Sequence, residues 1–106
     1  MKFELKGPFK ENIYNLMRKV GYHPAPLSKG RGKQRGELSF ARPPRGYPRF
    51  HLFVKVEGEN LIFNLHLDQK APIYKGAPAH AGEYDGELVS KEAERIKQIL
   101  EKNVKN

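Results

Sequence analysis

His51, His66 and Asp68 are the residues whose types and spacing point most directly to chemistry. They belong to the segment RFHLFVKVEGENLIFNLHLD, residues 49 to 68, which alternates apolar and polar side chains on both sides of Gly58. Glycine suits a tight turn, so the segment predicts a β-hairpin whose tip begins at Gly58. In that register His51 faces His66 directly, and Asp68 shares their face of the hairpin.

Two imidazoles and one carboxylate can do two kinds of chemistry. They suit a divalent transition metal, and a histidine pair can act as general acid and base in cleaving a phosphodiester. His80 would join them if residues 69–88 folded back over the sheet. The competing interpretation is two histidines that pair across a solvated sheet face for structural reasons. His51, His66 and Asp68 are therefore candidate catalytic residues and, together with His80, candidate metal ligands.

Basic residues form the second feature of the sequence. The run KGRGKQRG, residues 29–36, combines cationic side chains with glycines that keep the backbone adaptable, and further arginines follow it. Contact with about five phosphates would give binding a log-log salt slope of about −4 to −5 through counterion release. The candidate nucleic-acid-binding residues are Lys29, Arg31, Lys33, Arg35, Arg42, Arg45, Arg49, Phe53 and Lys55.

The charge of the chain is distributed unevenly. Twenty Lys and Arg stand against twelve Asp and Glu, which gives a net charge of +8 over 106 residues. The first 56 residues hold 13 of the basic groups and three of the acidic ones. This asymmetry favours a polyanionic partner, namely nucleic acid, an acidic protein or the ribosome. A loop that serves only solubility is the competing interpretation.

Aromatic side chains lie near the basic run. Tyr22, His23 and Tyr47 flank the run and offer flat faces on which unpaired bases can stack. Phe53 is predicted on the polar face of the hairpin, where it would serve as a stacking platform. The alternative is that the apolar residues of segment 69–88 cover Phe53 as a small satellite cluster.

Several classes of protein are excluded or disfavoured. The chain has no cysteine, which removes disulfides and thiolate chemistry. No apolar run has the length of a signal peptide or a membrane span, so we expect a cytoplasmic protein without a membrane partner. Phosphate-binding glycine loops, dinucleotide fingerprints and serine-nucleophile elbows do not occur, and we expect no organic cofactor.

The elements that must position these residues form one small domain over residues 1–106. We expect a short strand at 2–6, a helix at 8–20, a strand at 37–41, the hairpin at 49–68 and a final helix capped by Ser90. Irregular loops are expected at 22–36, which carries the basic run, and at 69–88. The predicted fold is α+β in the order (β)αβββα, a small antiparallel sheet of three to four strands with helices on one face and a polar face left open.

These expectations lead to one principal functional hypothesis and one alternative. The principal hypothesis is a small basic nucleic-acid-binding domain that prefers RNA. The alternative is a histidine-dependent or metal-dependent phosphodiesterase or nuclease that uses His51, His66 and Asp68.

Overall fold

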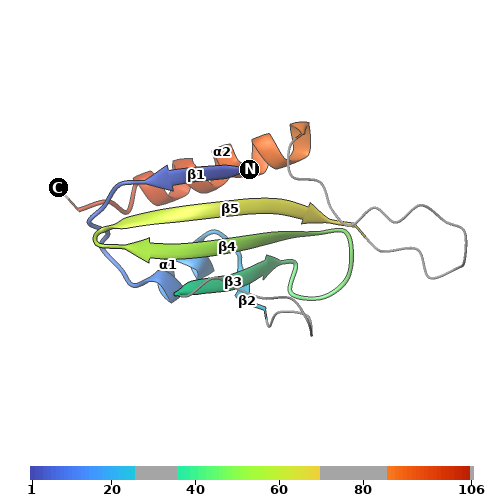
Figure 1. Ribbon diagram of the computed structural model, residues 1–106, viewed down its shortest axis with the longest axis horizontal. Helices are drawn as coiled ribbons and strands as arrows, with labels where there is room; N and C mark the ends of the chain where they lie inside the picture. The colour runs from blue at the N-terminus through green and yellow to red at the C-terminus, as the bar shows by residue number, and fades with distance from the viewer. Residues whose placement is uncertain (26–35, 70–85, 106) are drawn as a thin grey trace, which may run out of the picture.

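The fold has two layers, a five-stranded antiparallel sheet and two helices. The computed structural model describes residues 1–25, 36–69 and 86–105. The strands lie in the order β1-β5-β4-β3-β2 (Figure 1). Their bounds are Lys2–Leu5 for β1, His23–Pro24 for β2, Glu37–Arg42 for β3, Arg49–Glu57 for β4 and Asn60–Asp68 for β5, and the helices are α1, Ile13–Lys19, and α2, Glu87–Glu101. The predicted α+β class is confirmed, with β2 as an additional edge strand of two residues.

The β4–β5 hairpin has the predicted register. Glu57 pairs with Asn60 around the turn, and Arg49 pairs with Asp68 at the other end. Gly58 has a φ of 60°, a backbone conformation that residues other than glycine rarely adopt. Because successive side chains alternate between faces, this register divides the hairpin into one apolar face and one polar face.

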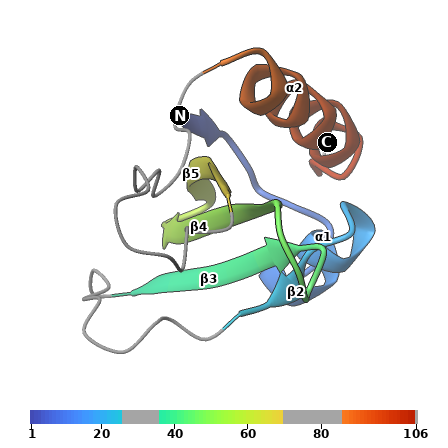
Figure 2. The same ribbon diagram turned by 90° about the vertical axis from the view of Figure 1, so that its right-hand side faces the viewer.

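Both helices cover the apolar face of the sheet (Figure 2). Phe63 is fully buried there and stacks on Phe3 with ring centroids 4.9 Å apart. Truncating such a residue to alanine typically costs about 3–5 kcal/mol, because the cavity left behind adds to the lost transfer free energy. The fully or almost fully buried core residues from the sheet and helices include Leu16, Met17, Phe40, Leu52, Val54, Phe63, Leu65, Val89, Ala93, Ile96 and Leu100.

Helix α1 is shorter than predicted. It begins at Ile13, not near Pro8, and the side chain of Asn12 caps it by accepting a hydrogen bond from the Asn15 amide at 2.9 Å. The residues before Asn12 pair instead with the chain that follows α2. The Lys10 amide donates to the Asn103 carbonyl and the Lys105 amide donates to the Pro8 carbonyl, each at 2.8 Å. Tertiary pairing thus replaces the first predicted turn of the helix.

Helix α2 also begins at a different residue from the predicted one. Gly86 is the N-cap, and the Ser90 amide donates to the Gly86 carbonyl at 2.9 Å, so Ser90 lies inside the first turn. Ala93, Ile96 and Leu100 recur at helical spacing and are buried against the sheet. Val104 lies beyond the helix and forms an isolated bridge with Phe9.

The predicted loops are described only in part. Residues 22–25 are not loop throughout, because β2 pairs His23 with Ala41 and Tyr22 is 2% exposed. The basic positions Lys29, Arg31, Lys33 and Arg35 lie outside the described residues, as does His80. Of segment 69–88, only the two ends are described.

Candidate functional site

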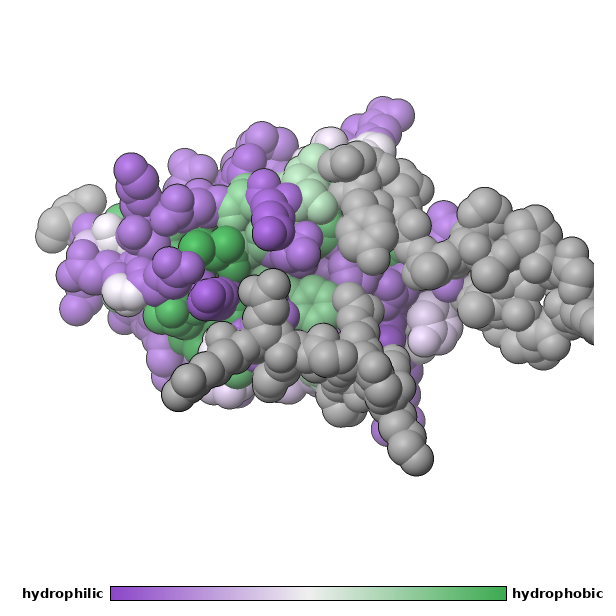
Figure 3. Space-filling model, in the orientation of Figure 1, coloured by the Kyte–Doolittle hydropathy of each residue, from purple (hydrophilic) through white to green (hydrophobic). Residues whose placement is uncertain are grey.

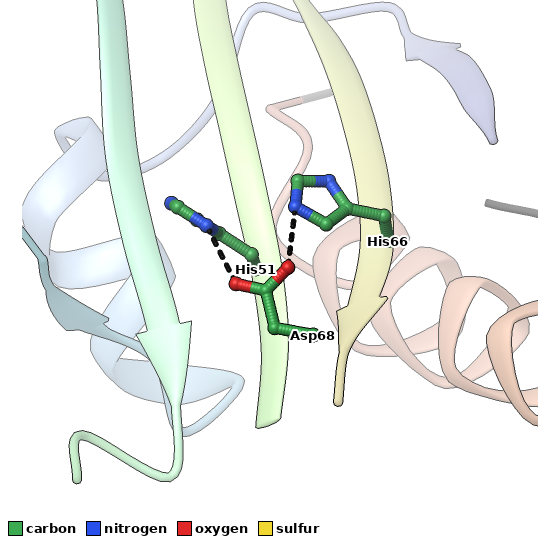
Figure 4. Close-up of side chains that lie close together, drawn as sticks. All are labelled: His51, His66 and Asp68. Carbon is green, nitrogen blue, oxygen red and sulfur yellow. Dashed lines mark hydrogen bonds and ion pairs between the residues drawn. The ribbon is translucent and has the colours of Figure 1, made fainter. Parts of the chain in front are cut away.

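The site lies on the sheet face opposite the helices, where Figure 3 shows mostly hydrophilic side chains around a small hydrophobic area. His51 on β4 and His66 on β5 are direct cross-strand partners. Asp68 follows His66 by two residues, so the alternation of the strand returns its carboxylate to the same face. Figure 4 shows the Asp68 carboxylate between the two imidazoles. The sequence-based expectation that these three residues meet is borne out by this geometry.

Each carboxylate oxygen of Asp68 contacts one histidine. His51 Nδ1 lies 3.2 Å from Oδ2, and His66 Nε2 lies 2.9 Å from Oδ1. Burial alone would raise the pKa of the Asp68 carboxyl, but the hydrogen bonds from His51 and His66 outweigh burial and hold the pKa well below its usual range. Asp68 is therefore a carboxylate anion between two imidazole nitrogens at neutral pH.

Ser39 on β3 completes the contacts of the His51 ring. Its Oγ lies 2.6 Å from His51 Nε2, so both ring nitrogens of His51 have polar partners. In the tautomer that carries hydrogen on Nδ1, the ring donates to Asp68 and accepts the Ser39 hydroxyl hydrogen. Sequence reasoning missed Ser39. The alternation of ELSFA, which places Leu38 and Phe40 on the apolar face, was the signal that assigns Ser39 to the polar one.

Phe53 packs against both histidines. Its ring stacks on His51 with centroids 4.4 Å apart and on His66 with centroids 5.6 Å apart. Phe53 is 4% exposed, His51 3% and His66 1%. The expectation of an open polar face is therefore wrong at these positions. The burial of Phe53 does not fit an exposed stacking platform, and most of segment 69–88, which was expected to cover Phe53, lies outside the described residues.

Arg49 adds a positive charge at the end of the site. Its Nε lies 3.7 Å from Asp68 Oδ2, and its guanidinium lies over the Tyr47 ring at 5.0 Å from the centroid. Tyr47 is 52% exposed, and Arg45 beside it is also exposed. The β3–β4 connection and the first residue of β4 thus place two arginines and one aromatic ring at the same end of the sheet as Asp68.

Two other predicted phosphate-binding residues do not join this group: Arg42 lies at the same end of the sheet but on its other face, and Lys55 lies toward the opposite end. Arg42 alternates onto the helix side of β3 and forms an ion pair with Glu92 at 3.2 Å. Lys55 lies further along β4 and pairs with Glu57 at 3.9 Å. The described basic residues therefore do not form a single continuous row.

A second polar cluster, which sequence reasoning also missed, surrounds Glu92 on the helix side of the sheet. Glu92 is 5% exposed and accepts hydrogen bonds from Tyr22 at 2.7 Å and from Arg95 at 2.8 Å, while Arg42 provides a further charge. Burial would raise the pKa of Glu92, but the bonds from Arg95 and Tyr22 prevail and lower it. Burial and the bond to Glu92 raise the pKa of Tyr22. This cluster joins α2 to β3 and to the chain after α1.

Comparisons with protein-family models, with curated proteins and with solved structures find no match for this chain. Neither α1 nor α2 has the length and apolar character that crossing a lipid bilayer requires. Function is therefore argued from the residues themselves.

Proposed function

We propose that this protein binds nucleic acid, and RNA in preference to DNA. The observation that carries the proposal is the charge asymmetry: 13 basic and three acidic residues in the first 56, against seven and nine in the remaining 50. Phosphate contacts provide the sequence-independent part of nucleic-acid affinity, and a local excess of Lys and Arg is what they require.

The end of the sheet near Arg49 supports this proposal. Arg45 and Arg49 supply charge, and Tyr47 supplies an exposed ring on which an unpaired base can stack. Arg49 is held in place by Asp68 and Tyr47, so less side-chain freedom is lost when it binds a phosphate. Unpaired bases are far commoner in RNA loops than in duplex DNA, which favours RNA as the ligand.

The second candidate function is phosphodiester cleavage, and the observation in its favour is the pair of imidazoles on either side of Asp68. A general acid or base must reach the proton that it transfers. His51 and His66 are 3% and 1% exposed, so substrate access would require the site to rearrange. Burial therefore favours binding over catalysis as the first function to test.

The test is fluorescence anisotropy with a labelled single-stranded RNA at about 50 and about 200 mM salt. We expect a log-log slope of about −3.5 if five phosphates are contacted, which is shallower than the slope of about −4 to −5 for a duplex because a single strand releases fewer counterions per contact. Replacing Arg31, Lys33 and Arg35 by alanine should weaken binding for every sequence tested and reduce the slope by about 0.7 per lost contact.

The matched control removes the same charge elsewhere. Replacing Lys91, Lys102 and Lys105 by alanine also lowers the net charge by three, but in the second half of the chain, where all three residues are exposed. This variant should keep most of the affinity. Equal losses in the two triple variants would show that net charge alone attracts RNA, and full affinity in the first variant would refute binding through the basic run.

A further inference from the structure

The group of His51, His66 and Asp68 has the composition of a transition-metal site. Each residue offers one ligand atom, and the three atoms lie within 4.8 Å of one another. We propose that these three side chains bind one divalent first-row transition metal ion per chain, with Zn²⁺ and Co²⁺ as the ions to test. This proposal does not depend on nucleic-acid binding.

The distances are close to those that a metal ion imposes. Zinc bonds to nitrogen and carboxylate oxygen are about 2.0–2.2 Å, so a tetrahedral ion holds its ligand atoms about 3.4 Å apart. His51 Nδ1 and His66 Nε2 lie 3.2 and 2.9 Å from the Asp68 oxygens that they contact. All three atoms lie within 4.8 Å of one another, so rotation of the side chains must bring them closer for one tetrahedral ion to bind all three, with the fourth position left for water.

The choice of ligand atoms selects the class of metal. Imidazole nitrogen suits zinc, cobalt, nickel, copper and iron, whereas Mg²⁺ and Ca²⁺ prefer shells made of oxygen. Two nitrogens and one carboxylate, contributed by His51, His66 and Asp68, therefore disfavour the hard cations. The chain has no cysteine that would compete for a zinc ion.

The groups around the ligands would orient them for metal binding. In a metal-bound histidine, the N–H group of the second ring nitrogen usually donates a hydrogen bond to a partner, which fixes the ring. Ser39 Oγ occupies that position 2.6 Å from His51 Nε2. Phe53 supports the faces of both imidazole rings, and all three ligands stand on two paired strands, which are more rigid than loops.

A hydrogen-bonded cluster of His51, His66 and Asp68 without an ion explains the same distances. The experiment must therefore distinguish a metal site from such a cluster. The full chain is stripped with EDTA, dialysed free of chelator and titrated with Co²⁺ and Zn²⁺. We expect visible d–d bands that saturate at one Co²⁺ per chain, displacement of Co²⁺ by Zn²⁺, and a higher melting temperature with either ion.

Two substitutions make a matched pair. His66→Asn removes a ligand and should weaken Co²⁺ binding by at least about tenfold, while His23→Asn changes an exposed histidine on β2 and should leave binding unchanged. Ser39→Ala should weaken binding by about tenfold, as the loss of a group that positions a ligand does.

A measurement on the unmodified chain covers the case in which His66→Asn does not fold. Long-range ¹H–¹⁵N spectra distinguish the imidazoles, and Zn²⁺ should shift the signals of two of the four histidines, His51 and His66. Absence of saturable binding, or a Zn²⁺ shift confined to His23 and His80, would overturn the proposal and leave a hydrogen-bonded cluster.

Discussion

Tyr22 donates a hydrogen bond to Glu92 at 2.7 Å although 70 positions separate the two residues in the sequence. The contact connects the chain directly after α1 to the first half of α2, and both residues are buried. A buried carboxylate is tolerated only where its charge is compensated, and here Arg95 and Arg42 provide the compensation.

Glu92→Gln should lower the free energy of unfolding by about 1–3 kcal/mol, because the substitution leaves two arginines beside a neutral amide. The control is Glu94→Gln, two residues along the same helix, where the side chain is exposed and the change should stay within about 0.5 kcal/mol. Urea unfolding of both variants measures the difference. Equal stabilities would show that the buried carboxylate is not stabilising.

The Glu92 carboxylate should make the free energy of unfolding depend on pH in the acidic range. The pKa of Glu92 is lowered in the folded state, so its contribution is fully present above the ordinary value of 4.5 and is lost as the pH falls below it. The difference in unfolding free energy between the native chain and Glu92→Gln should therefore shrink between neutral pH and about pH 3. Asp68 is common to both proteins, so its titration cancels in this difference. A difference that stays constant with pH would contradict the lowered pKa.

Ser39→Ala should destabilise the fold by about 0.5–1.5 kcal/mol, because His51 Nε2 loses its partner at 2.6 Å. Ser90→Ala is the matched control, since Ser90 is exposed on α2 and alanine suits a helix. Thermal or urea unfolding in the presence of EDTA keeps metal binding out of the measurement. Indistinguishable stabilities of Ser39→Ala and the native chain would argue against this hydrogen bond.

Tyr47→Leu should weaken RNA binding by about tenfold, the typical cost of one lost base-stacking contact. Tyr14→Leu provides the comparison, because Tyr14 is 50% exposed and Tyr47 is 52% exposed, but Tyr14 lies on α1 away from Arg49. Anisotropy titrations with the same labelled RNA measure both. Similar affinities for the two variants would remove Tyr47 from the interface.

RNA incubated with the native chain should stay intact, with or without added Zn²⁺, because both imidazoles are buried. A denaturing gel of end-labelled RNA is the measurement. Cleavage that disappears in His66→Ala, while binding persists, would reverse our preference and support the phosphodiesterase.

The hairpin was predictable because its pattern is local. Alternation with a period of two, interrupted by Gly58, allows one register that keeps the apolar residues together, and this register places His51 opposite His66. The same alternation on β3 was sufficient to assign Ser39 to the polar face. Once the register of one strand pair is known, it limits the register of the next strand, and therefore the face of the sheet on which the residues of that strand lie.

Features that depend on distant parts of the chain could not be read from local patterns. Glu92 lies on a helix of mixed charge, which is typical of a solvated surface, and only the approach of Tyr22 and Arg42 makes it a buried residue. The start of α1 depends on Asn103 and Lys105, whose backbones form hydrogen bonds with those of Lys10 and Pro8. Burial of Phe53 likewise follows from tertiary packing, which the strand pattern does not specify.

The backbone bridge between residues 8–10 and 103–105 ties together two segments that are almost a hundred positions apart in the sequence. Opening one segment exposes the amides of the other, so the two should exchange with deuterium as a single cooperative unit. The Lys10 and Lys105 amides would then lose their protection against exchange at the same time. Neither of the two segments would open independently of the other.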